Sequence, residues 1–290
     1  MQRTALSNRF TVIAIALIAY AGVNICHEII GHCAMAALSG TKCTLISSTY
    51  IPLATQPPTW TYRIIVGAGS AANWTFALLC LGLLRSLRRA NPGLRYFLWL
   101  SLCLNLFLPS TYMAAAPIIK YGDSYILISS LRAQFFWRSA LVLAGVVICW
   151  FSFLLCRREL GRLIGRGGWM ARSIAWQLVA PAYVTGGIVT VASGLFSQLP
   201  AKWAQLQAAG GTFGLTVWLL LLPLGIPEPP APAQHPFIVP RSAGWIVAGA
   251  VSALIFIGVL GPGILGKFLC GRGQAYDSAI GDFRSDSVTH

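Results

Sequence analysis

Long apolar stretches separated by short polar segments make up most of this chain. A membrane-crossing helix needs about 20 mostly apolar residues. On this criterion we predict spans over residues 10–38, 60–84, 95–118, 136–156, 173–196, 211–226 and 243–265. The sixth stretch is short and contains Pro223. The pattern therefore predicts an all-α fold, a polytopic membrane helix bundle of six to seven transmembrane helices.

These stretches also divide the chain into segments. Three spans lie in residues 1–135, and further membrane helices follow over 136–226. A Pro-rich connector is predicted over 227–242, a last membrane span over 243–266, and a polar C-terminal tail over 267–290.

Composition supports a membrane protein and excludes other classes. Hydrophobic residues make up 56% of the chain and charged residues only 10%, against about 25% in a soluble domain. The net charge of +14 comes from basic residues scattered between apolar runs, so we expect no nucleic acid partner. Membrane lipid is the expected surrounding.

Two Arg-rich loops predict the orientation of the bundle, because short cytoplasmic loops retain Lys and Arg. One loop joins the second and third spans, and the other joins the fourth and fifth. Alternating spans place both loops on the side of the N-terminus, which we expect to be cytoplasmic, in a bacterial inner membrane. The ends of the first and third spans then face the outer side. The basic residues are Arg85, Arg88, Arg89 and Arg95 in the first loop, and Arg157, Arg158, Arg162, Arg166 and Arg172 in the second.

Acidic residues are scarce, which isolates the candidates for chemistry. Of seven, five are expected in loops, the connector or the tail, Glu159 among them. The other two are Glu28, deep in the first span, and Asp123, just after the third. His27 and His32 flank Glu28. Three ionisable groups at membrane depth are costly unless paired, hydrated or bound to a metal.

Two imidazoles and a carboxylate within six residues have the composition of a zinc hydrolase site. In such a site histidines hold the metal and the glutamate activates water. The alternative is that these groups hydrogen-bond other spans and stiffen the bundle.

The histidine spacing decides which groups could share a metal. His27 and His32 are five residues apart, which separates them by about 140° on a regular α-helix. A local π-bulge, eased by Gly31, would return both to one face. In the alternative geometry Glu28 and His32, four apart, act together without a bulge.

Three segments carry a resemblance to a known family. The run His27-Glu28-Ile-Ile-Gly31-His32, followed by small residues and Leu38-Ser-Gly40, resembles the first catalytic helix of the site-2 protease family of intramembrane zinc metalloproteases. The family motif reads H-E-x-G-H, so this chain carries one extra residue. The segment Val66 to Asn73 is similar to the family's small-residue helix ending in Asn, and Asn105-Leu-Phe-Leu-Pro109 resembles its Asn/Pro segment.

The resemblance covers residues 15–125 and implies a role for each candidate. His27 and His32 would bind zinc, and Glu28 would be the general base. In the family an Asp-Gly pair supplies the third ligand; here the pair is Gly122-Asp123, reversed and farther downstream. The predicted topology places Asp123 on the same membrane face as the histidines, although an ordinary turn-capping carboxylate accounts for it equally. Asn73 is either a contact for substrate or a strut between spans.

We therefore expect a membrane-embedded zinc metalloprotease that cleaves peptide bonds in or near the bilayer, with a membrane protein or peptide as substrate and residues 1–135 as its core. One alternative is a non-catalytic integral membrane subunit or scaffold of a larger membrane complex, favoured by the extra residue in the motif. A second alternative, Glu28 and His32 with a redox metal, lacks the array of Glu-x-x-His ligands typical of such sites.

Overall fold

The protein is a bundle of long α-helices, seen in a computed structural model that describes residues 6–165, 167–197, 210–226 and 237–265. Within these ranges six helical stretches are long and apolar enough to cross a membrane. The first is a continuous rod, Arg9–Leu38, built from three elements. Its elements are α1 (Arg9–Ile25), the π-helix η1 (Cys26–Cys33) and α2 (Ala34–Leu38). The others are α3 (Thr59–Ser86), α4 (Pro92–Ile119), α6 (Gln134–Ile164), α7 (Gly168–Leu195) and α9 (Ala243–Ile255) with its π-helical end η3 (Phe256–Leu260). The predicted all-α membrane bundle is confirmed.

The predicted sixth span, 211–226, is not long enough to cross a membrane. The apolar helix there covers Gly210–Leu221 and ends in a 3₁₀ turn, η2 (Val217–Leu221). At 1.5 Å per residue it reaches about 18 Å, well short of the roughly 30 Å of a bilayer core. Pro223 lies two residues after Leu221 and has no amide hydrogen with which to extend the hydrogen-bonded ladder.

The predicted fourth span is too short, because α6 continues to Ile164. Glu159 therefore lies in a helix and not in a loop, and only 3% of its surface is exposed. Its carboxylate accepts hydrogen bonds from Arg85 at 2.7 Å and Arg162 at 2.8 Å. A sequence pattern that treats a run of charges as solvated misses this burial, because the partner Arg85 comes from another helix.

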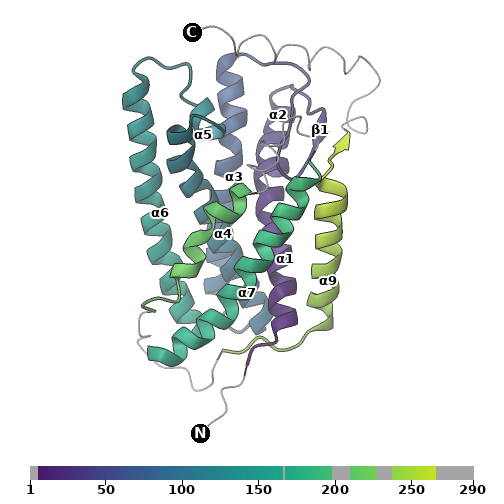
Figure 1. Ribbon diagram of the computed structural model, residues 1–290, viewed down its shortest axis with the longest axis vertical. Helices are drawn as coiled ribbons and strands as arrows, with labels where there is room; N and C mark the ends of the chain where they lie inside the picture. The colour runs from purple at the N-terminus through teal and green to yellow at the C-terminus, as the bar shows by residue number, and fades with distance from the viewer. Residues whose placement is uncertain (1–5, 166, 198–209, 227–236, 266–290) are drawn as a thin grey trace.

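From α1 to α7 the successive long helices alternate in direction, and α9 runs in the same direction as α7 (Figure 1). The start of α1, the α3–α4 connection and the adjoining ends of α6 and α7 lie at one end of the bundle. This end carries the described arginines of both predicted loops, whereas Lys42, Arg63, Lys120, Arg132 and Arg138 lie toward the other end. The other end carries η1, α2, the short helix α5 (Asp123–Ile126) and a two-stranded sheet. That sheet pairs β1 (Leu45–Ile46) antiparallel with β2 (Ile264–Leu265).

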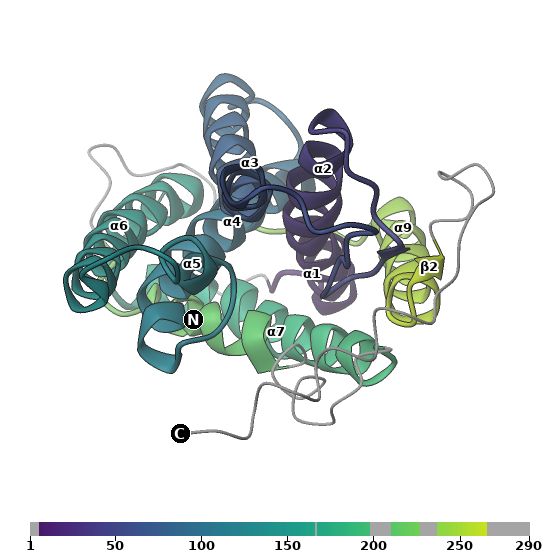
Figure 2. The same ribbon diagram turned by 90° about the horizontal axis from the view of Figure 1, so that it is seen from above.

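The core lies around α4 and α1, with the other helices arranged about them (Figure 2). Fully buried aromatic side chains fill it, and their polar atoms are satisfied: the Tyr96 hydroxyl donates to the Leu178 carbonyl, and the Trp99 indole donates to the Cys156 carbonyl. Helices α6 and α9 lie at opposite edges, and both expose most of their apolar surface. Exposed apolar faces of this kind are what a surrounding lipid phase requires.

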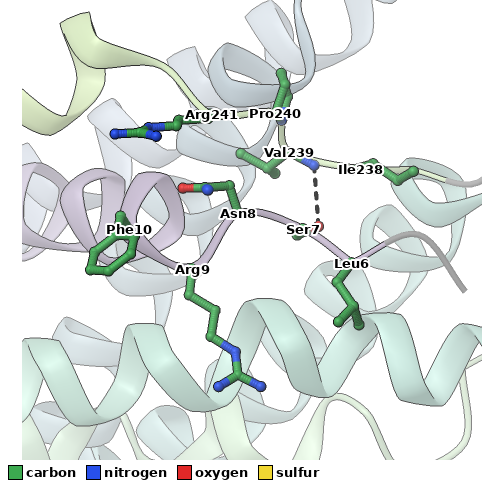
Figure 3. Close-up of a pocket in the computed structure, with 9 residues that line it drawn as sticks. All are labelled: Leu6, Ser7, Asn8, Arg9, Phe10, Ile238, Val239, Pro240 and Arg241. Atoms are coloured by element: carbon green, nitrogen blue, oxygen red, sulfur yellow. Dashed lines mark hydrogen bonds between the residues drawn. The ribbon is translucent and has the colours of Figure 1, made fainter.

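Residues 237–242 lie beside the start of α1, at the end of the bundle away from η1. The Asn8 amide donates to the Val239 carbonyl at 2.8 Å, and the Val239 amide donates to the Ser7 hydroxyl at 3.1 Å. A pocket of about 510 Å³ lies here (Figure 3), and neither His, Cys, Asp nor Glu lines it. The remainder of the predicted connector, 227–236, and the predicted tail, 267–290, lie outside the described residues.

Candidate metal centre

The two histidines are brought together by a change in helix type. Residues Cys26–Cys33 form a π-helix within the first rod, as the five-residue spacing predicts. Their imidazole ring centroids lie 4.8 Å apart with the planes at 89°. A π-helical stretch returns residues five apart to one face, whereas a regular α-helix would not. The extra residue in the motif is therefore accommodated in the backbone and does not separate His27 from His32.

Asp123 completes a three-residue cluster. Its Oδ2 atom lies 3.0 Å from His27 Nε2 and 3.2 Å from His32 Nε2. The three ligand-type atoms all lie within 4.8 Å of one another, so the group could hold a metal ion. Asp123 is the first residue of α5, which directly follows the end of α4. The predicted proximity of Asp123 to His32 is confirmed, although the two are 91 residues apart.

The outer nitrogens of both imidazoles are already used. His32 Nδ1 lies 2.8 Å from the Ile65 carbonyl, which can only accept a hydrogen bond. His27 Nδ1 lies 2.8 Å from Asn73 Oδ1. The Asn73 amide nitrogen donates to the Val23 carbonyl and to Asn105 Oδ1, which fixes the Asn73 oxygen toward His27. Both Nδ1 atoms must therefore carry the proton.

This tautomer leaves a lone pair on Nε2 of each neutral imidazole. Two lone pairs and a carboxylate oxygen then converge on one point, an arrangement of acceptors that a cation satisfies. Tetrahedral zinc with ligand bonds of 2.0–2.1 Å places neighbouring ligand atoms about 3.4 Å apart, close to the observed 3.0 and 3.2 Å. Two of the three separations thus match a zinc site, and all three lie within 4.8 Å. The cluster therefore fits a metal in its chemistry, with outer hydrogen bonds that orient the ligands.

The Asp123 carboxylate is kept in its charged form. Burial raises the pKa of this group, but hydrogen bonds from the imidazoles when they carry a proton on Nε2 outweigh burial and hold the pKa below its usual range. A carboxylate that stays ionised is the form that binds a metal.

Glu28 lies between the two histidines in sequence but outside their cluster. Its side chain is partly buried, and it makes neither a hydrogen bond nor an ion pair to another residue in the described part of the chain. The candidate ligand set contains Asp123 in its place, so the alternative pairing of Glu28 with His32 is not the one that the structure brings together.

Close contact between η1 and α3 makes room for the histidine rings. A Cβ atom added to Gly31 would lie 2.5 Å from the Gly69 Cα, so the two backbones touch. A Cβ atom added to Gly69 would lie 2.6 Å from His32 Nε2 and 2.8 Å from His27 Cε1. The small-residue stripe of the second span is thus a packing surface that also forms one wall of the site.

Asn73, one of the predicted site residues, lies behind the His27 ring. The residue is fully buried, and its amide is occupied by His27, Val23 and Asn105. Its hydrogen bonds join α3 to α1 and α4, the contacts expected of a strut between helices. The chain of bonds continues to Asn105, whose amide nitrogen donates to the Ser101 carbonyl. An Asn inside an apolar run is the signal that marks Asn105, but its role depends on contacts that the sequence does not display.

Comparisons with protein-family models, with curated proteins and with solved structures give no match. The site geometry and the membrane fold therefore carry the functional argument.

Proposed function

We propose that this protein is a membrane-embedded zinc metalloprotease, resembling the site-2 protease family, that cleaves peptide bonds in or near the bilayer. The observation that carries the proposal is the convergence of His27 Nε2, His32 Nε2 and Asp123 Oδ2 beside an unpaired Glu28. Three protein ligands leave one zinc position for water or substrate, as hydrolytic sites require.

Each residue has a defined task in this reaction. Bound zinc would polarise the scissile carbonyl and make water acidic enough to attack it. Glu28 accepts the proton of the attacking water and returns it to the departing amine, the role of a general base and then a general acid. Asn73 and the Ile65 carbonyl hold the two imidazoles in the tautomer that presents Nε2 to the metal.

The rival proposal, a non-catalytic membrane subunit, drew its support from the extra residue between Glu28 and Gly31. The π-helix accommodates that residue and keeps both histidines at one point. The extra residue, which favoured a degenerate protease-like site, is therefore also consistent with an intact metal site.

The decisive experiment compares wild type with Glu28→Gln in detergent or in vesicles, using a membrane-spanning peptide as substrate. Wild type should bind about one zinc per chain and cleave the peptide. Glu28→Gln should retain zinc, because Glu28 is not a ligand, and should lose cleavage by roughly 10²–10⁴-fold. Wild type that takes up no zinc, or Glu28→Gln that cleaves normally, would contradict the proposal.

We further propose that the end carrying the N-terminus and both basic connections faces the cytoplasm, so that the metal cluster lies toward the outer side. The positive-inside rule supports this orientation. Single-cysteine variants Arg89→Cys and Arg132→Cys provide a matched test, because both arginines are exposed and lie at opposite ends of the bundle. A thiol reagent that cannot cross the membrane should label only Arg132→Cys from outside. Labelling of Arg89→Cys alone would reverse the orientation.

A further inference from the structure

The hydroxyl of Tyr112 lies against the backbone that leads into Asp123. Tyr112 is in α4, and its oxygen accepts a hydrogen bond from the Asp123 backbone amide at 3.3 Å. That contact joins residues 11 positions apart, across the turn between α4 and α5. The structure shows no other hydrogen-bond acceptor for this amide within the described residues.

Gly122 brings the same phenol into close contact with the turn. Its φ of 86° lies in the region that favours glycine. A Cβ atom added there would lie 1.8 Å from the Tyr112 hydroxyl oxygen, a separation that no real side chain could adopt. Tyr112 thus touches two consecutive residues, the glycine and the candidate ligand. This contact accounts for the order Gly-Asp in this chain, because the glycine is needed where the phenol rests.

Tyr112 shares a face of α4 with Asn105, since residues seven apart lie two turns from each other on the same side. Asn105 supports His27 through Asn73. Tyr112 meets the Gly122-Asp123 turn at the other end of the cluster. One face of α4 therefore carries two residues that contact the surroundings of the cluster. Asn105 bonds to Asn73 behind His27, and Tyr112 bonds to the backbone of Asp123.

We propose that Tyr112 is a positioning residue for the metal centre: its phenol fixes the Gly122-Asp123 turn so that Asp123 Oδ2 meets both Nε2 atoms. The inference rests on the proposed function, because it assumes that the cluster binds a metal. Tyr112 acts through Asp123 and needs no contact with the metal or the substrate. Partners that orient a ligand in this way typically contribute about 10- to 100-fold to metal affinity.

The test uses Tyr112→Phe in the full-length protein, with Tyr125→Phe as control. The Tyr125 hydroxyl lies in α5 and forms no hydrogen bond within the described residues. Cobalt(II) titration gives the affinity, and the visible absorption of the bound ion reports the ligand geometry. Tyr112→Phe should bind cobalt about 10-fold more weakly, with an altered spectrum, while its unfolding temperature without metal stays near that of wild type. Tyr125→Phe should match wild type in all three measurements.

Gly122→Ala supplies a second, independent change to the same contact. It should weaken cobalt binding in the same direction as Tyr112→Phe, because it pushes the turn away from the phenol. Wild-type affinity and spectrum in Tyr112→Phe would overturn the positioning role and leave the proposed function standing. Wild-type protein that binds neither cobalt nor zinc would overturn both.

Discussion

Two carboxylates lie at opposite ends of the bundle, Glu159 buried and Asp123 partly buried, and each is contacted by two basic side chains. Asp123 meets His27 and His32, and Glu159 meets Arg85 and Arg162. Both clusters join elements that are distant in sequence. The clusters differ in their basic partners: arginine can only donate hydrogen bonds, whereas a neutral histidine also offers a lone pair.

The Glu159 cluster is complete without any further group. Guanidinium groups are always charged and donate hydrogen bonds, so two of them satisfy a carboxylate directly. Arg85 donates through both Nε and a terminal nitrogen. This cluster fastens α3 to α6, and its two guanidinium groups have no lone pair that could bind a metal.

The Asp123 cluster consists of acceptors. Its imidazoles direct their protons outward to Asn73 and the Ile65 carbonyl, so their lone pairs face the carboxylate. The nitrogen–oxygen distances in the two clusters are similar, but the chemistry differs. The Glu159 cluster is an ion pair, whereas the Asp123 cluster is a set of candidate metal ligands. The difference teaches that the hydrogen bonds on the far side of a ring decide whether a His/Asp contact is structural or can bind a metal.

The largest expected effect comes from Asp123→Asn, which replaces a charged ligand with a neutral amide of the same shape. Zinc affinity should fall by more than 100-fold, beyond the about 10- to 100-fold that outer partners contribute. Competition with a chromophoric chelator measures it. The fold should persist, because α5 is a single turn at the end of the bundle. Unchanged zinc affinity would remove the distinction between the two clusters.

Gly69→Ala tests the wall of the site. The added methyl group would lie within 3 Å of both imidazole rings, so the rings must move. Overpacking of this kind costs about 1–3 kcal/mol, and we expect a loss of zinc affinity of a corresponding size, roughly 5- to 150-fold. Gly82→Ala is the control, since it lies in the same helix with nothing within 4 Å of the added atom. Equal effects of the two variants would show that Gly69 matters only as a helical glycine.

Glu159→Gln should give the reverse of Asp123→Asn. Breaking a buried ion pair costs about 3–5 kcal/mol, and the partly exposed arginines reduce this to about 1–2 kcal/mol through solvent screening. Thermal unfolding in detergent should show a lower midpoint. Zinc affinity should stay that of wild type, because the residue lies at the other end of the bundle. A loss of zinc with Glu159→Gln would show that the two ends are coupled.

The smallest effect should come from Asn105→Leu, two hydrogen bonds away from the imidazole. The substitution removes the acceptor of the Asn73 amide, so Asn73 is held toward His27 less firmly. We expect zinc affinity to fall by up to about 10-fold, the low end of the range for outer partners. The same chelator competition measures this change. No change at all would limit the orienting network to Asn73 and the Ile65 carbonyl.

The sequence by itself determined the helix bundle and the location of the candidate metal centre. Apolar length is a local property, so the spans could be predicted from composition along the chain, and scarcity of acidic residues isolated Glu28 and Asp123. The five-residue spacing of His27 and His32 also predicted the π-helix, because helical geometry relates spacing to direction.

Tertiary structure alone decided which partners these residues meet. Glu159 in a buried ion pair, Asn73 behind His27 and Tyr112 beneath the Gly122-Asp123 turn all depend on helices brought together from distant parts of the chain. A residue's polarity says that it needs a partner when buried, but the partner is selected by how the helices cross. How the helices cross depends on packing between whole helix surfaces, such as the contact of Gly31 with Gly69. A local sequence pattern does not contain this information.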